Sequence, residues 1–367
     1  MKTIINIAIQ ASVIFIQKFV YCFKLKRIKK IIEKVKFDKK KNKYILIYVG
    51  NQNKFDRNDL ALINTHKKKS AYIVYVTNFN DFDDYEDCPV DVFINNNNVG
   101  WDFSMYKTAT LYLLKNIREL PQKILYVNNS CYYFSDEKNK FFENFFDKKF
   151  DFISPFENTL TGLYSPWHLS SWCFSVSKNF FLSTEYLQFW NSYKDIRNKF
   201  YAIKNGEHLL TKVALVYSGK LKAVYDYNQI LKIFRQKLKL VGYNGLKKYL
   251  PKKLIVDFSN YINIDSIALD SDKDSHLIDF IQTEIHKYFS AHAFAIFLIQ
   301  FENFPFLKKD IFFFSGQSYN NLGLLKSVLQ KKYCEQTSID CINSLLKRGR
   351  YTDSTIILRL KYLLGLR

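Results

Sequence analysis

The chain has 367 residues, with 55 Lys and Arg against 34 Asp and Glu, so its formal net charge is +21 at neutral pH. Hydrophobic residues make up 48% of it and aromatic residues 17%, with 11 Gly and 6 Pro, which excludes a disordered chain, a collagen-like repeat and a disulfide-stapled miniprotein. The absence of a long uninterrupted apolar run excludes a polytopic membrane protein. The six cysteines form no C-x-x-C pair, which favours buried reduced thiols over a zinc site.

The N-terminal segment combines an apolar stretch with concentrated positive charge. Residues 4–16 are mostly apolar, but a helix of this length spans only about 20 Å of the roughly 30 Å hydrocarbon core of a bilayer. Residues 18–43 hold twelve Lys and Arg against two acidic residues. Apolar side chains recur among them at helical spacing and predict a basic amphipathic helix, through Leu25, Ile28, Ile32 and Val35.

These features predict that residues 1–43 associate with an anionic membrane surface. The protein is then cytoplasmic and peripheral on the inner face of the plasma membrane. Two alternatives stay open, a signal anchor and a helix that packs on the protein's own core. A secretory signal is disfavoured, because the heavy positive charge follows the apolar stretch and no A-x-A cleavage site is present.

After residue 43, apolar runs rich in β-formers alternate with segments of helical periodicity. Four such runs predict buried strands, at Tyr44–Val49, Ala71–Val76, Val90–Ile94 and Lys123–Val127. Between them, helices are expected at Asp59–Lys68 and Phe103–Ile117. Strands that alternate with helices in this way predict an α/β fold with a mostly parallel, doubly wound, Rossmann-like sheet.

The second half of the chain has shorter elements and then becomes mainly helical. The pattern predicts a short helix at Phe141–Phe146, a strand at Asp151–Ser154, a loop at Pro155–Trp167, a strand at Ser171–Val176, helices at Lys178–Lys194 and Glu207–Tyr217, and a strand at Lys222–Tyr225. Helical patterns continue through 276–300 and 320–348. We therefore divide the chain into an N-terminal segment 1–43, a core 44–228 and a mainly helical region 229–367.

Ligands of such sheets bind beyond the carboxyl ends of the strands, where this chain places polar loops. The candidate loops are Asn51, Thr77–Asn80, Asn95–Asp102 and Asn128–Ser130. A dehydrogenase or a P-loop enzyme is not supported, because neither G-x-G-x-x-G nor a Walker A motif is present.

Two of these loops carry residues suited to a sugar nucleotide. Gly100 lets a ligand approach the backbone, and Asp102 either caps a helix or binds a ribose or sugar hydroxyl. Asn128-Asn129-Ser130 closes a strand with neutral side chains, which form either a turn or a diphosphate site. Amides bind Mg²⁺ or Mn²⁺ poorly unless carboxylates or phosphates join them, so no cofactor is firmly predicted.

His168 and Glu207 are two further candidates. His168 lies where a loop meets a strand, and it is either structural or a partner of a diphosphate or acceptor. Glu207 follows Asn205-Gly206 at the start of a helical stretch, and it is either a capping carboxylate or a general base.

Taken together, these segments resemble the rhamnan-synthesis (rhamnosyltransferase F-like) glycosyltransferases. The resemblance rests on NVGWD (98–102), VNNSCYYF (127–134), HLSSWCFSVSKNFF (168–181), GEHLLTKVAL (206–215) and FPFLKKD (304–310), with SAHAF (290–294) before the last of them. It covers roughly residues 44–312 and implies a GT-A-type nucleotide-sugar core. The implied activity is transfer of a sugar, often rhamnose or another deoxysugar, onto a growing surface polysaccharide or lipopolysaccharide. The family commonly has Asn-Asp-Ser where this chain has Asn128-Asn129-Ser130, so metal dependence is in doubt.

The resemblance also suggests roles for individual residues in an inverting displacement. The donor is expected to contact the loops after the early strands, at Asn51, Thr77, Asn78, Asn98, Gly100 and Asp102, with Asn128, Asn129 and Ser130 facing its diphosphate. Positive charge for the diphosphate comes from Lys107, His168 or Lys308, and Ser171 and Trp172 lie on the acceptor and phosphate side. Glu207 is the leading candidate for the base that deprotonates the acceptor, ahead of Asp102 and Asp226.

The expected partners are a nucleotide-sugar donor, a lipid-linked or polysaccharide acceptor and the cytoplasmic membrane surface. Nucleic acid is not expected, because the charge concentrates at one terminus and no nucleic-acid motif is present. Two alternative functions stay open. One is a catalytically silent carbohydrate-binding relative, given the neutral Asn129, and the other is a sugar-phosphate transferase of capsule synthesis.

Overall fold

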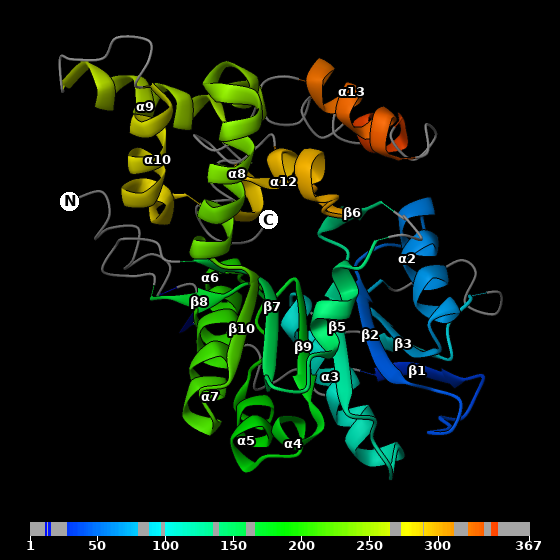
Figure 1. Cartoon of the computed structure of the whole chain (residues 1–367). Coiled ribbons are helices and arrows are strands. Elements are labelled where there is room, and N and C mark those ends of the chain that lie inside the picture. The colour runs from blue at the N-terminus through cyan, green and yellow to red at the C-terminus, as the bar shows by residue number, and fades with distance from the viewer. Residues whose placement is uncertain are drawn as a thin grey trace.

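The computed structural model describes residues 12, 14–15, 28–79, 88–96, 100–134, 139–158, 166–264, 273–288, 290–311, 322–333 and 339–343. Within them the protein is an α/β structure built on a large mixed, mostly parallel sheet (Figure 1). The strands of this sheet are β1 Ile28–Glu33, β2 Tyr44–Gly50, β3 Ala71–Thr77, β4 Val92–Asn96, β5 Lys123–Asn128, β7 Phe152–Asn158, β8 His168–Leu169, β9 Cys173–Ser177 and β10 Leu221–Tyr225.

The sheet has the order β1-β4-β3-β2-β5-β9-β7-β10, with β8 paired to β7. The neighbours β4, β3, β2 and β5 run parallel, as do β7 and β10. Strand β9 runs antiparallel between β5 and β7, and β1 runs antiparallel along the outer edge of β4. The chain thus proceeds outward from β2 to β3 and β4, and then returns to the other side of β2 to form β5.

Helices cover both faces of the sheet, because the central strands are buried on both sides. In β2, Tyr44, Leu46 and Tyr48 belong to one hydrophobic cluster, whereas Ile45, Ile47 and Val49 belong to the other. The helices of the core are α2 Arg57–Lys68, α3 Asp102–Asn116, η1 Phe141–Phe146, α4 Lys178–Phe181, α5 Thr184–Ser192, α6 Lys199–Tyr201, the π-helix η2 Ala202–His208 and α7 Leu209–Tyr217. Helix α2 packs in the first cluster, and α3, α5 and α7 pack in the second.

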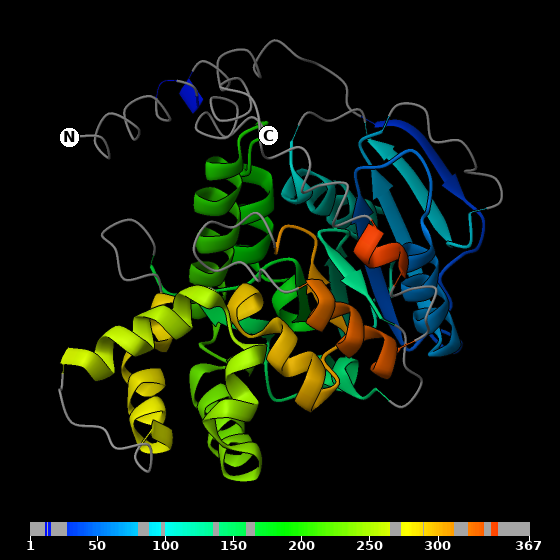
Figure 2. The same ribbon diagram turned by 90° about the horizontal axis from the view of Figure 1, so that it is seen from above.

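The C-terminal region adds helices to the first cluster and one strand outside the main sheet. Its elements are α8 Tyr227–Leu246, η3 Lys247–Tyr249, α9 Lys252–Ile264, α10 Lys273–Glu284, η5 Ile285–Lys287, α11 Ser290–Ala293, α12 Ala295–Glu302, β11 Phe306–Lys308 and α13 Leu322–Lys332. These helices lie above the strands of the sheet in Figure 1, and the view from above shows them side by side there (Figure 2). Strand β11 pairs antiparallel with β6 Cys131–Tyr133, directly after β5.

The predicted core strands are confirmed with small shifts of their ends, but the helix predicted through residues 25–35 is wrong. Ile28–Glu33 forms β1, which pairs with β4 from Val92 to Asn96. The spacing of the isoleucines suits a helix locally, yet β4 would otherwise expose its unpaired backbone groups at the edge of the sheet. Ile32 packs half-buried against the core, whereas Ile31 stays 44% exposed.

Three shorter predictions need correction. The helix predicted at Lys178–Lys194 is two helices, because Ser177 and Ser183 each cap a new N-terminus through their side chains. The first residues of the predicted loop Pro155–Trp167 belong instead to β7, which ends at Asn158, and residues 159–165 lie outside the described residues. The helix predicted at Glu207 begins earlier, as the π-helical turn η2 that continues into α7.

Little of the N-terminal apolar stretch belongs to the described residues. Ile14 packs partly buried against the second cluster, while Phe15 is 72% exposed. Among the helices described, none is both long enough and apolar enough to cross a membrane. The described cysteines, Cys88, Cys131, Cys173 and Cys341, are buried free thiols, as expected.

Candidate functional site

The candidate site lies at the carboxyl ends of β2 and β5, where the order of the sheet reverses. Strand β3 pairs with one edge of β2 and β5 with the other. The elements that follow β2 and β5, helix α2 and strand β6, both pack in the first hydrophobic cluster, so the loops after β2 and β5 lie side by side. The loop after β5 is the turn Asn128-Asn129-Ser130, in which Ser130 N donates to Asn128 Oδ1 at 3.0 Å.

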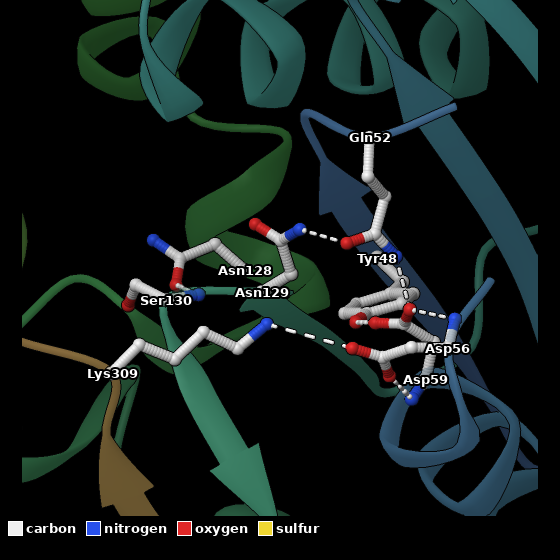
Figure 3. Close-up of polar contacts among 8 residues, drawn as sticks. All are labelled: Tyr48, Gln52, Asp56, Asp59, Asn128, Asn129, Ser130 and Lys309. Atoms are coloured by element: carbon white, nitrogen blue, oxygen red, sulfur yellow. Dashed lines mark hydrogen bonds and ion pairs between the residues drawn. The ribbon is translucent and has the colours of Figure 1, made fainter. Parts of the chain in front are cut away.

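The turn after β5 is tied to the loop after β2. Asn129 Nδ2 donates to Gln52 Oε1 at 2.9 Å, and the two side chains point toward one another (Figure 3). Gly50 makes this approach possible, since a Cβ there would lie 3.1 Å from Asn129 Nδ2 and 2.8 Å from the Tyr75 hydroxyl oxygen. The expected site residue Asn51 is exposed, and its neighbour Gln52 makes the contact instead.

Beneath Gln52 lies a buried carboxylate that the sequence analysis missed. Asp59 is 1% exposed, and it accepts hydrogen bonds from the Tyr48 hydroxyl, from Gln52 Nε2 and, at 2.7 Å, from Asp56 N (Figure 3). Burial and then the neighbouring Asp56 carboxylate raise the pKa of Asp59 to about 7, against the opposing effect of Lys309. The spacing Asp56-x-x-Asp59 was the available signal, because the two residues form a capping box at the start of α2.

Asp102 faces the same turn from the other side. It is the first residue of α3, with Trp101 as the N-cap, so the alternative that Asp102 is only a cap is wrong. Its Oδ2 accepts a hydrogen bond from Asn128 Nδ2. Burial raises the pKa of Asp102 to about 6, although Lys308 and the bond from Asn128 act in the opposite direction. The carboxylate therefore titrates close to neutral pH beside a turn that can hold a ligand.

Glu207 reaches the site because η2 packs closely on the start of α3. A Cβ on Gly206 would lie 2.7 Å from the Phe103 ring, so only glycine permits this contact. Glu207 Oε1 accepts a hydrogen bond from Ser171 N at 2.9 Å, and Thr211 Oγ1 accepts one from Leu169 N at 3.1 Å. These bonds join the predicted segments HLSSWCF and GEHLLT. Glu207 also lies near enough to Asp102 to act on its charge.

The motif FPFLKKD (304–310) brings two lysines and an aspartate to the charged side chains around the turn Asn128–Ser130. Lys308 Nζ donates to Ser130 Oγ at 3.0 Å and lies 5.3 Å from the centre of the Trp172 ring. The next residue, Lys309, is 7% exposed and lies 4.0 Å from Asp56 Oδ2, as drawn in Figure 3. Asp310 Oδ1 pairs with His292 Nε2 at 2.9 Å, which joins this motif to SAHAF.

The charges around Asp310 oppose the effect of burial. Burial alone raises the pKa of a carboxyl group, but the hydrogen bond and charge of His292 and the charges of Lys308 and Lys199 hold the pKa of Asp310 below its usual range. Asp310 is thus ionised at neutral pH. Its charge, with that of Asp102, balances the lysines that surround the turn.

The remaining donor-side residues surround this cluster. Thr77 is buried at the end of β3, with its Oγ1 3.5 Å from Gln52 O. Asn78 Nδ2 donates to Gly100 O at 2.9 Å, so the loops after β3 and β4 are joined. Asn78 Oδ1 and Trp172 Nε1 are buried with no hydrogen-bond partner among the residues that the structure describes. Asn98 lies outside the described residues.

Three candidates have other partners. Lys107 Nζ donates to Tyr193 O at 2.7 Å, and Asp226 caps α8 by accepting a hydrogen bond from Gln229 N at 2.6 Å. His168 is 3% exposed, and its Nδ1 donates to Pro166 O at 2.8 Å. The centre of its ring lies 4.3 Å from that of His208, with the two rings tilted by 41°. These contacts favour structural roles for His168 and Asp226.

The donor set does not fit a divalent cation. Asn128 Oδ1 accepts from Ser130 N, and both oxygens of Asp59 are occupied by protein donors. Asn128 and Asn129 turn their amide nitrogens, which cannot ligate a cation, toward Asp102 and Gln52. Across the described part of the chain, no cluster of three or more His, Cys, Asp or Glu residues is arranged to hold a metal. The steps proposed below therefore rely on the protein's own side chains.

A surface hollow of about 960 Å³ lies elsewhere, near the amino ends of the strands and the end of α3. Its walls include Tyr72, Tyr112 and Arg118. Charges of both signs line it, and Lys39 pairs there with Glu119 at 3.1 Å. It shares no residue with the cluster at the switch point.

No protein-family model matches the chain, and no curated protein matches it either. The resemblance to rhamnan-synthesis glycosyltransferases therefore stays a hypothesis. It rests on the sequence motifs and on how the structure brings their residues together.

Proposed function

We propose that this chain is a glycosyltransferase that moves a sugar from a nucleotide-sugar donor to a growing cell-surface polysaccharide or lipopolysaccharide. The observation that carries the proposal is the gathering of Asp102, Glu207 and Lys308 around the turn Asn128–Ser130 at the switch point of the sheet. These residues come from four separate motifs of the sequence. A structural role for each motif alone would not require the charged side chains to meet at one place.

The fold supports a nucleotide-sugar donor in this position. The order β4-β3-β2-β5 corresponds to one half of a doubly wound nucleotide-binding sheet, in which ligands bind beyond the carboxyl ends of the strands. The reversed strand β9 beside β5 suits a GT-A-type core. The nucleoside of the donor is then expected to contact the loops after β2 and β3, and its diphosphate the turn after β5. In line with the resemblance, the transferred sugar is rhamnose or another deoxysugar.

The chemistry is an inverting displacement at the anomeric carbon. Glu207 takes the proton of the acceptor hydroxyl, whose oxygen then bonds to the anomeric carbon as the diphosphate leaves. The hydrogen bond from Ser171 N fixes the direction of the Glu207 carboxylate. Asp102, held by Asn128, accepts a hydrogen bond from a hydroxyl of the ribose or the donor sugar.

A lipid-linked acceptor explains the positive charge before the core. Residues 18–43 hold twelve Lys and Arg, and basic side chains near an anionic leaflet each contribute about 1 kcal/mol to binding. The protein is therefore proposed to act as a peripheral protein on the cytoplasmic face of the membrane, where such acceptors are extended.

The test is turnover by the full chain with a panel of nucleotide-sugars. The released nucleotide is quantified, and Glu207→Gln is compared with Glu185→Gln, a matched change at an exposed glutamate of α5. Loss of the base is expected to lower turnover by at least about 100-fold while donor affinity stays unchanged. The control is expected to match the wild type.

The products separate the alternatives. Release of a nucleoside diphosphate together with a glycosylated acceptor supports the proposal, whereas a nucleoside monophosphate indicates a sugar-phosphate transferase. Donor binding without turnover indicates a silent carbohydrate-binding relative. A wild-type chain that binds no nucleotide-sugar refutes the proposal.

A further inference from the structure

The leaving diphosphate requires a positive charge near the turn after β5. As the bond between the anomeric carbon and the diphosphate breaks, its electron pair stays on the diphosphate oxygen, and preorganised positive charge there stabilises the transition state. Of Lys107, His168 and Lys308, the structure brings Lys308 to this turn. Lys107 donates to Tyr193 O, and His168 pairs with Pro166 O.

Backbone pairing holds Lys308 in position. Strand β11 lies antiparallel to β6 with Lys308 opposite Cys131, and Lys309 N donates to Ser130 O at 2.9 Å. The ammonium group then reaches Ser130 Oγ at 3.0 Å and lies over the Trp172 ring. A flexible lysine on a surface loop would lose side-chain freedom on binding an anion, whereas Lys308 is already ordered.

The surroundings of Lys308 suit an anion. Its neighbours Asp102 and Asp310 balance its charge when no ligand is bound, and Lys199 adds a second positive charge that acts on both carboxylates. Trp172 Nε1, beneath the ammonium group, is buried with no partner among the described residues and is available to donate a hydrogen bond. At the turn itself, Asn128 Oδ1 already accepts from Ser130 N, and Asp102 Oδ2 accepts from Asn128 Nδ2.

We propose that Lys308, rather than a divalent cation, neutralises the diphosphate of the donor, an inference that rests on the proposed function. The ammonium group donates a hydrogen bond to the diphosphate and stays protonated throughout. The proton released in the reaction passes from the acceptor hydroxyl to Glu207. The bond from the anomeric carbon to the diphosphate oxygen breaks as the bond to the acceptor oxygen forms, so atoms and protons balance in this step.

The test is calorimetric titration of the full chain with UDP, GDP, ADP and dTDP, in EDTA and again with Mn²⁺. The wild type is expected to bind at least one of them in EDTA with an affinity that Mn²⁺ leaves unchanged. Lys308→Gln is expected to weaken that affinity about tenfold or more, as loss of a charge-assisted hydrogen bond predicts. Lys308→Arg keeps the charge and is expected to retain most of the affinity.

Lys212→Ala is the matched control, because Lys212 is an exposed lysine on α7 and its loss changes the net charge equally. It is expected to bind like the wild type. Thermal unfolding of each variant checks that it folds. If Lys308→Gln does not fold, the wild-type comparison of EDTA with Mn²⁺ still decides whether a cation is needed.

The outcomes distinguish this inference from the proposed function. Binding that requires Mn²⁺, or equal affinities of Lys308→Gln and wild type, overturns the role of Lys308 and leaves the glycosyltransferase proposal standing. Failure of the wild type to bind any of the four nucleotides, with or without Mn²⁺, overturns both.

Discussion

Replacement of Asp59 by Asn tests whether the buried carboxylate beneath Gln52 titrates near neutral pH. Asparagine can serve the same partners, since its Oδ1 can accept from Asp56 N and Gln52 Nε2 while its Nδ2 donates to the Tyr48 hydroxyl oxygen. The change therefore removes the charge and keeps the network. A loss of stability from broken contacts is not expected.

The expected change in the free energy of unfolding follows from the pKa of Asp59, which burial raises from 3.8 to about 7. The folded protein binds this proton more tightly than the unfolded chain, so the contribution of Asp59 to stability is complete below the ordinary pKa and is lost as pH rises toward 7. One pKa unit corresponds to about 1.4 kcal/mol, so the full loss is on the order of 4 kcal/mol. Asp59 is 1% exposed, so solvent screens little of this effect.

The assay is urea unfolding of the wild type and Asp59→Asn across about pH 4.5 to 8.5. Other buried groups also affect stability in this range. Burial raises the pKa of Asp102 to about 6, and it lowers the pKa of His66 to about 3, so that His66 takes up a proton on unfolding in the lower part of the range. Both groups are common to the two proteins, so the difference in unfolding free energy isolates Asp59. For each pH unit up to pH 7, the unfolding free energy of the variant is expected to rise by about 1.4 kcal/mol relative to that of the wild type. A difference that does not change with pH refutes the reasoning.

Two further predictions concern packing and the N-terminal segment. Gly206→Ala places a Cβ 2.7 Å from the Phe103 ring, so urea unfolding is expected to show a loss of about 1–3 kcal/mol, and unchanged stability would mean that η2 and α3 do not pack closely. Deletion of residues 1–27 keeps β1, which begins at Ile28, and eight of the twelve basic residues of 18–43, so it is expected to weaken membrane association only in part. Deletion of residues 1–40 removes ten of the twelve together with β1, so it is expected to move the protein to the soluble fraction and to lower the melting temperature. A protein that stays with the membrane after this second deletion contradicts the proposed attachment.

The core of the fold could be predicted because its strands are buried on both faces. Runs such as Tyr44–Val49 have no polar interruption, and a short run with this composition suits few other structures. The edge strand β1 could not be predicted, because its pairing with β4 depends on a strand about sixty residues away in sequence. Locally, its isoleucines fit a helix equally well.

The candidate site was predicted in part. Polar residues at the end of a strand or at the start of the helix that follows it, such as Asn128 and Asp102, follow from the parallel sheet alone. Asp59 was missed because charged residues on a helix are usually exposed, and burial of one depends on partners from other elements. The different partners of Lys308 and Lys309 depend on β11, whose pairing with β6 no local pattern indicates.

The pairing of β11 with β6 has a consequence for how the protein is made. Lys308 and Ser130 are separated by 178 positions in the chain, although their side chains touch. On the ribosome, the sheet strands up to Tyr225 emerge well before β11 does. A nascent chain released before β11 would hold the sheet strands without Lys308 beside Ser130, so the proposed anion site would form only near the end of synthesis.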